Sequence, residues 1–212
     1  MRHLNPIDQL IVQSDHALRT IFGKPVTTER ENPSLNTTEN NLSEAERKLS
    51  SSLMRVNHSG EVSAQALYQG QALTARLDSV RESMHRAALE ENDHLAWTEQ
   101  RLTELSSQKS LLNPVWYGGS FAIGAIAGLL GDKWSLGFVA ETEHQVIKHL
   151  EEHLEKLPEN DARSEAVLKQ MKTDEAHHAT IALEGGGAEL PWPVKKLMAA
   201  MSKVMTTSAY YI

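Results

Sequence analysis

The chain has 212 residues, a net charge of −7 and no cysteine. This length suits a single domain, or one bundle with appendages. The acidic balance and the lack of a basic stripe argue against nucleic acid as a partner. The absence of cysteine excludes disulfides, zinc fingers and thiolate catalysis. No apolar signal core opens the chain, which favours a bacterial protein on the cytoplasmic side.

Residues 1–42 are predicted to form an accessory helix and a polar linker. Asn5 and Pro6 suit the N-cap and the first position of a helix. The apolar residues that share one side of this helix are Ile7, Leu10, Ile11, Leu18, Ile21 and Phe22. Residues 23–42 are polar and contain Pro25, Pro33, Asn36, Asn40 and Asn41. This composition is typical of a mobile linker.

Residues 43–212 are predicted to form an all-α bundle, which begins at the capping-box pattern of residues 43–46. Each half of this region carries a Glu ahead of a Glu-x-x-His pair. Glu61 precedes the pair Glu91 and His94, and Glu143 precedes the pair Glu175 and His178. Because residues i and i+3 share a helix face, each pair presents a carboxylate and an imidazole together.

Two further pairs, Glu82/His85 and Glu141/His144, imitate this motif, and helical periodicity separates them from the first two. The apolar positions of residues 84–105 alternate steps of four and three and include Glu91, whereas Glu82 falls about half a turn away. The apolar positions of residues 136–154 include Glu143 and place Glu141 about 200° away. The same reasoning turns Glu61, Glu175 and His178 inward.

The selected residues are therefore Glu61, Glu91, His94, Glu143, Glu175 and His178. Each buried, ionised carboxylate costs several kcal/mol unless it is paired, and two neutral imidazoles cannot offset four. Two divalent ions would neutralise the set, which is the ligand inventory of a di-metal site in a four-helix bundle. Carboxylates and imidazoles without thiolate favour iron or manganese over zinc. The alternative is that these are ordinary polar residues at the edge of the core.

Residues 110–131 carry no charge, and three interpretations remain open. They could form a bundle helix with a crossover, a segment that dips into a membrane interface, or a membrane span. The spacing of Gly124 and Gly128 permits close helix contact. A final amphipathic helix follows Pro191, and its predicted apolar face consists of Val194, Leu197, Met198, Met201 and Met205. Nearby Trp192, lysines and terminal tyrosines favour a membrane interface over simple bundle packing.

Several motifs resemble those of the demethoxyubiquinone hydroxylase family of ubiquinone biosynthesis. They are residues 55–61 (RVNHSGE), residues 68–71 (YQGQ), residues 91–95 (ENDHL), Glu143 with His149, and residues 174–178 (DEAHH). The likeness covers about residues 50–212, and bacterial members have an N-terminal extension like residues 1–45. The resemblance implies a ferritin-like di-iron fold, peripheral attachment to the bacterial cell membrane, and O2-dependent hydroxylation of a polyprenylated benzoquinol ring.

Carried over position by position, the resemblance gives the same six residues as iron ligands, for two Fe²⁺ ions per chain. It also gives His149 a place beside the centre, as a proton carrier that does not bind metal, against the simpler reading of a surface histidine. Eukaryotic members have Tyr where this chain has Leu150, so that tyrosine's role cannot be transferred. The resemblance further implies a quinol substrate, a lipid surface and other ubiquinone-biosynthesis proteins as partners.

The sequence does not identify the reductant, because the only glycine cluster, residues 185–187, follows a helix and lacks the dinucleotide-binding context. The nearest alternative function is a ferritin-like iron-storage or peroxide-reducing protein, which would need the same ligands. A helical scaffold without catalysis is a third hypothesis, but it leaves four inward carboxylates unexplained.

Overall fold

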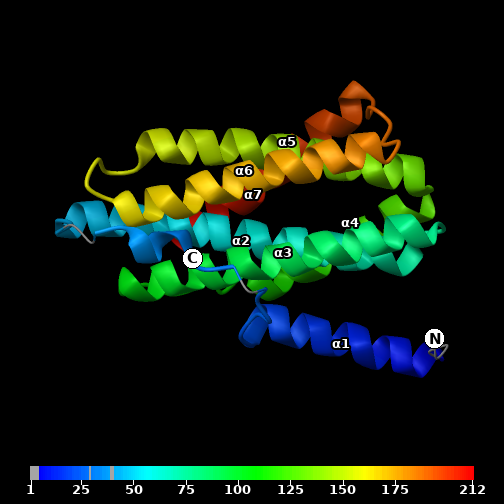
Figure 1. Ribbon diagram of the computed structural model, residues 1–212, viewed down its shortest axis with the longest axis horizontal. Coiled ribbons are helices and arrows are strands. Elements are labelled where there is room, and N and C mark those ends of the chain that lie inside the picture. The colour runs from blue at the N-terminus through cyan, green and yellow to red at the C-terminus, as the bar shows by residue number, and fades with distance from the viewer. Residues whose placement is uncertain (1–4, 29, 39–40) are drawn as a thin grey trace.

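The computed structural model describes residues 5–28, 30–38 and 41–212. Of the residues named above, Asn40 and the side chains of Pro6 and Leu10 lie outside this description. Four long helices form an antiparallel bundle (Figure 1): α2 (Glu44–Thr74), α3 (Asp78–Glu104), α5 (Asp132–Lys156) and α6 (Ala162–Glu184). They pair as two hairpins, α2 with α3 and α5 with α6. The fold is all-α, as predicted from the sequence.

Helix α2 begins where the sequence predicts a capping box. The Ser43 hydroxyl accepts from the Glu46 backbone N–H, and the Glu46 carboxylate accepts from the Ser43 N–H at 2.8 Å. The predicted apolar positions of α3 are buried along its length, from Met84 to Leu105. Those of α6 behave likewise, from Leu168 to Ala182. On α3 and α6, the side chains that the sequence predicts to face inward are thus the ones buried in the bundle.

Residues 110–131 form the crossover between the two hairpins. Helix α4 (Asn113–Leu129) runs beside α2. Glycines at the contact allow the two backbones to approach closely. A Cβ on Gly124 would lie 2.3 Å from the carbonyl oxygen of Leu67, and one on Gly70 would lie 2.3 Å from that of Phe121. The predicted close helix contact is confirmed. Among the described residues, no helix is both long and apolar enough to cross a membrane.

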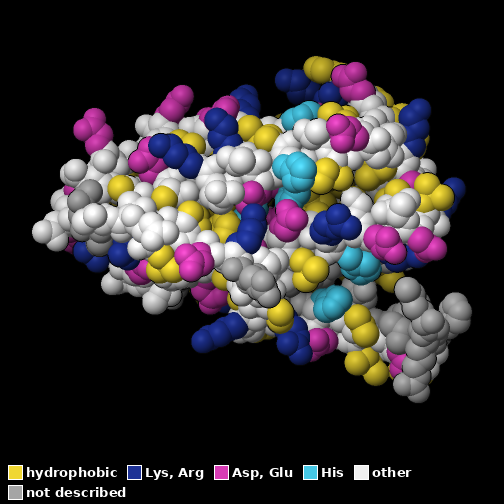
Figure 2. Space-filling view, in the orientation of Figure 1, with side chains coloured by type: hydrophobic (Ala, Val, Ile, Leu, Met, Phe, Trp, Pro, Cys, Tyr) yellow, Lys and Arg dark blue, Asp and Glu magenta, His cyan; other side chains and the backbone are white. Residues whose placement is uncertain are grey.

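Two further helices lie outside the bundle and keep apolar side chains exposed. Helix α1 (Pro6–Phe22) starts at the predicted Asn5 cap and lies below the bundle in Figure 1. Hydrophobic side chains gather along it in Figure 2, and Ile7 and Phe22 are about 70% exposed. Helix α7 (Trp192–Tyr211) packs on α2. Its exposed apolar face contains Leu197, Met201 and Val204.

The predicted face of α7 is partly wrong. Met198 and Met205 are only half-exposed, whereas Val204 is 63% exposed. The sequence could not show that α2 would cover one side of this helix, which rotates the exposed face by part of a turn.

The segment between α1 and α2 is not the free linker that its composition predicts. A short 3₁₀ helix, η1 (Pro33–Asn36), packs against α6. Asn32 caps it through the Ser34 N–H, and both residues are buried. We call Thr28 and residues 30–36 the N-terminal strap. The strap lies across α3 and α6, level with the middle of the bundle.

Candidate metal centre

The six Glu and His residues selected from the helical period lie together inside the bundle. Glu61 comes from α2, Glu91 and His94 from α3, Glu143 from α5, and Glu175 and His178 from α6. None of them is more than 5% exposed. One inward turn from each of the four helices therefore contributes to a single buried polar cluster.

The cluster divides into two overlapping groups. One consists of Glu61, Glu91, His94 and Glu175, and the other of Glu91, Glu143, Glu175 and His178. Within each group, one ligand atom from every residue lies within 4.8 Å of the others. Each group thus has one histidine and one carboxylate of its own and shares two carboxylates with its neighbour. This arrangement suits two adjacent metal ions bridged by carboxylates.

The shared residue Glu175 lies between the two histidines. Its Oε1 lies 3.2 Å from His94 Nδ1, and its Oε2 lies 3.0 Å from His178 Nδ1. Glu91 faces the same two nitrogens, with Oε2 3.2 Å from His94 Nδ1 and Oε1 3.4 Å from His178 Nδ1. Each shared carboxylate therefore points one oxygen toward each half of the site.

The outer nitrogen of each histidine is held by a carboxylate from the opposite hairpin. His94 Nε2 lies 2.9 Å from Asp174 of α6, and His178 Nε2 lies 2.8 Å from Glu90 of α3. Such partners fix the ring orientation and leave Nδ1 free for a metal. Sequence reasoning missed both residues. The available signal was an acidic residue directly before each inward Glu on α3 and α6.

Several carboxylate oxygens of the cluster are poorly satisfied. Tyr68 donates to Glu143 Oε1, but Glu143 Oε2 is buried without a partner in the described part of the chain. In that same part, Glu61 Oε2 and Glu91 Oε1 are buried with a histidine Nδ1 near them, at 3.3 and 3.4 Å, and make no well-formed hydrogen bond. Buried acceptors of this kind are destabilising unless something satisfies them. Metal ions would satisfy all three, so the residues fit a two-metal centre.

The electrostatics of the cluster also favour metal. Burial, reinforced by the Glu91 carboxylate, raises the pKa of Glu61 well above its usual value, and burial beside Glu175 and Glu91 does the same to Glu143. Burial alone would lower the pKa values of His94 and His178, but hydrogen bonds to surrounding carboxylates outweigh it and raise both. A raised pKa favours the protonated form of each of these four groups, and four protons carry four positive charges. Two divalent ions carry the same four charges, so metal binding exchanges with protons.

The pairs that imitate the motif lie elsewhere. Glu82 and His85 are exposed on α3. His144 is exposed on α5, and Glu141 makes an ion pair with Lys195 of α7 at 3.4 Å. The exclusion of these residues by helical phase is therefore confirmed by their positions.

A cavity of about 270 Å³ opens between α3 and α6 and reaches the cluster. Tyr68, Glu90 and His178 lie at its polar end. The rest of its wall is mixed: one part is apolar, and the other is polar, formed by residues of α3. The apolar residues are Met84, Ala87, Val139, Ile181 and Ala182, and the polar ones are Ser79, Glu82, Ser83 and Arg86. Because the opposite half of the cluster, around His94, is fully buried, this cavity places the accessible side of the centre at His178.

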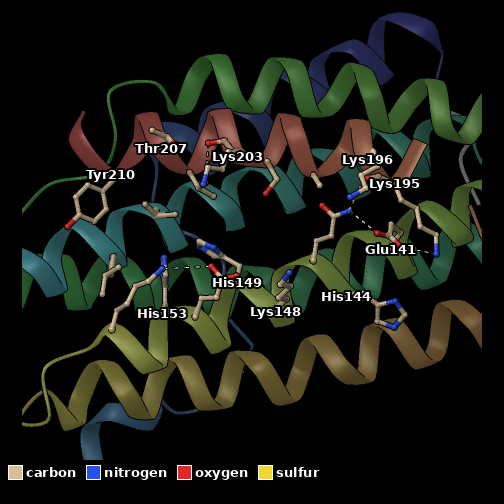
Figure 3. A pocket seen from close by; sticks show the side chains of 18 of the residues that line it. Glu141, His144, Lys148, His149, His153, Lys195, Lys196, Lys203, Thr207 and Tyr210 are labelled. Atoms are coloured by element: carbon tan, nitrogen blue, oxygen red, sulfur yellow. Dashed lines mark hydrogen bonds and ion pairs between the residues drawn. The ribbon is translucent and has the colours of Figure 1, made fainter. Parts of the chain in front are cut away.

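A larger groove of about 950 Å³ lies between α5 and α7 and is also lined by α2 (Figure 3). His149 lines this groove beside His153, with 3.9 Å between ring centroids. His153 Nδ1 lies 2.9 Å from the Asn57 amide oxygen. Burial lowers the pKa of His149 to about 4. His149 belongs to neither metal group.

Comparison with known proteins identifies the family. A family model described as ubiquinone biosynthesis protein COQ7 matches residues 48–209. The chain belongs to the COQ7 family. It is 62% identical over 211 residues to the 3-demethoxyubiquinol 3-hydroxylase of Nitrosococcus oceani, covering 100% of this chain and 99% of the relative. The enzyme of that name from Nitrosomonas europaea is 57% identical, covering 97% of this chain and 99% of the relative. The one from Acinetobacter baumannii is 56% identical, covering 100% of both chains.

The region matched to the COQ7 family contains all six residues of the cluster. It begins at residue 48, after α1 and the N-terminal strap. The relatives nevertheless match this chain along almost its whole length, including the N-terminal elements.

Proposed function

We propose that this chain hydroxylates the ring of 3-demethoxyubiquinol, a polyprenylated benzoquinol, with O2 as co-substrate. The ligands would be Glu61, Glu91, His94, Glu143, Glu175 and His178, holding two iron ions. The observation that supports this most strongly is the pair of four-residue groups that share Glu91 and Glu175. Bound iron would supply the O2 activation and electron transfer that ring hydroxylation requires. The external reductant stays unassigned.

The residues around the cluster would position the reacting groups. The cavity between α3 and α6 offers the quinol ring an apolar wall at Met84 and Ile181 and a polar end at Tyr68 and Glu90. Tyr68 holds Glu143 in place through its hydroxyl hydrogen bond. The long prenyl tail would leave through the open end of this cavity, because the remaining sides of the cluster are closed by packed helices.

Attachment to the cytoplasmic face of the bacterial cell membrane is part of the proposal. Helices α1, α4 and α7 each expose apolar side chains, among them Ile11, Ile126 and Leu197, each about 60% exposed. On α4 the exposed face carries no charged residue between positions 113 and 130. Such surfaces are costly in water and suit a lipid interface that holds the quinol substrate. Other ubiquinone-biosynthesis proteins could share these surfaces as partners.

The test of the function is anaerobic reconstitution with Fe²⁺, followed by reaction with ¹⁸O2 and a demethoxyubiquinol of defined tail length. Mass spectrometry should find one ¹⁸O atom in the ring product. Glu91→Ala and Glu175→Ala should lose both iron and product while keeping a helical circular dichroism spectrum. Full hydroxylation by a metal-depleted variant would refute the catalytic centre. Accumulation of many ferric ions without product would instead support the storage alternative.

A further inference from the structure

The N-terminal strap reaches the outer edge of the metal centre. Arg30 donates from Nε to Asp93 Oδ2 at 2.8 Å and from Nη1 to Asp174 Oδ2 at 2.8 Å. Asp174 Oδ2 is the same oxygen that lies 2.9 Å from His94 Nε2. One guanidinium thus joins α3 to α6 and contacts the carboxylate that orients a proposed ligand.

Asp93 accepts hydrogen bonds that hold the strap on α3. It stands beside His94 on α3, is 0% exposed, and belongs to neither metal group. Its Oδ1 accepts from the Thr28 N–H at 2.7 Å, and its Oδ2 accepts from the Thr28 hydroxyl at 2.6 Å and from Arg30. Within the described residues, all of the hydrogen bonds to Asp93 come from the strap. Without the strap this buried carboxylate would have no hydrogen-bond donor among the described residues, and its burial would be costly.

A second contact connects Arg30 to the same ligand by packing. The guanidinium lies over the Trp97 ring, with Cζ 5.1 Å from the ring centroid. The Trp97 ring in turn packs against the His94 ring, with 5.4 Å between centroids. His94 is therefore held from two sides, through Asp174 at Nε2 and through Trp97 on its face, and Arg30 contacts both supports.

The other half of the centre has no such clamp. Glu90, which holds His178 Nε2, has a side chain that is 31% exposed and lines the cavity between α3 and α6. The hydrogen bond to His178 lowers the pKa of Glu90 and the charge of Arg30 contributes to this, but no arginine or lysine forms an ion pair with Glu90 among the described residues. The two histidines have matching carboxylate partners, but only the partner of His94 is joined by Arg30 to the buried Asp93.

We propose that Arg30 is a positioning residue and that the strap makes the two metal positions unequal. The strap fixes the position served by Glu61 and His94, and leaves the position served by Glu143 and His178 adjustable next to the cavity. This inference rests on the two-metal part of the proposed function. It assigns a role at the centre to a segment that precedes the region matched to the COQ7 family.

The inference is tested on the full-length protein under anaerobic conditions. In one titration Co²⁺ is added and its binding is monitored through the absorption bands of the bound ion. In the other, Fe²⁺ is titrated in the presence of a competing chelator. Arg30→Gln should lower the affinity for one of the two ions by roughly 10- to 100-fold, the usual effect of losing a group that supports a ligand. The affinity for the other ion should stay unchanged. Arg30→Lys should restore part of the loss. Arg19→Gln is the matched control, because the one ion pair of Arg19 among the described residues is with Asp15 on the exposed face of α1.

A double variant gives a second measure. If Arg30 acts through Asp174, Arg30→Gln should have little further effect on metal affinity in an Asp174→Asn background. The inference would be overturned if Arg30→Gln bound each of the two ions as tightly as the unmodified chain does. A fall in thermal stability with no change in metal affinity would also overturn it. Fewer than two ions in the unmodified chain would refute the proposed two-metal centre itself, so the two failures are distinguishable.

Discussion

The two acidic residues Glu141 and Glu143 of α5 offer a stringent test of the proposed ligands. They stand two positions apart on one helix, yet Glu143 is 1% exposed in the cluster and Glu141 faces Lys195 of α7. Glu143→Gln keeps the side-chain volume and the acceptor for Tyr68 but removes one negative charge. We expect it to lose metal affinity and nearly all hydroxylation, whereas Glu141→Gln should stay close to the unmodified chain.

The magnitudes follow from burial and charge. Four carboxylates balance two divalent ions, so Glu143→Gln leaves one positive charge uncompensated in a closed site. Breaking a buried charge pair in this way costs about 3–5 kcal/mol. At about 1.4 kcal/mol per tenfold change, metal affinity should fall by roughly 10²- to 10⁴-fold. Glu141 loses only a partly exposed ion pair, which contributes roughly 0.2–1 kcal/mol.

The assay combines chelator-competition binding of Fe²⁺ with product formation, and circular dichroism checks that both variants fold. Because the change is the same at both positions, differences in expression or overall charge cancel. If Glu141→Gln lost metal and Glu143→Gln retained it, the helical phase of α5 would be wrong by two residues. Glu141 would then take the place of Glu143, and His144 would become a candidate ligand.

Three further predictions concern protons, packing and lipid. Metal affinity should fall as pH is lowered from 8 to 6, because the raised pKa values of the two site histidines favour protons over metal; a flat affinity profile in chelator competition would contradict this. Gly124→Ala should lower the free energy of unfolding by about 1–3 kcal/mol through overpacking, while Gly118→Ala, whose Cβ meets nothing within 4 Å, should leave it equal or higher in urea titrations. Replacing Leu197, Met201 and Val204 with Ser should reduce sedimentation with liposomes, since each fully buried apolar side chain contributes about 1.5–3 kcal/mol; unchanged sedimentation would place the lipid contact on α1 or α4.

The helical period was sufficient to predict the bundle and the inward residues. The apolar positions on α3, α5 and α6 include Glu91, Glu143 and Glu175, because an inward carboxylate occupies a position that packing would otherwise give to an apolar side chain. That phase is a local property of each helix, so one sequence can show it. The likeness to a known family selected the same residues independently.

What the sequence did not predict depends on contacts between distant segments. Asp174 and Glu90 orient histidines on the opposite hairpin, which requires knowing how α3 and α6 are aligned. The strap reads as a mobile linker because polar residues such as Thr28 and Arg30 have no partners nearby in sequence. Their partner, Asp93, is more than sixty positions away. Composition reports what a segment lacks locally and cannot report what it meets in the fold.

The glycine contact between α2 and α4 limits how the protein can open. Side chains can absorb a small shift between helices by changing rotamer, but at Gly70 and Gly124 backbone touches backbone. Helices α2 and α4 therefore have little room to shift against each other. The α3–α6 side has no such backbone contact among the described glycines and already contains the cavity. We therefore expect motions that admit a bulky molecule on that side, with Glu61 on α2 displaced least.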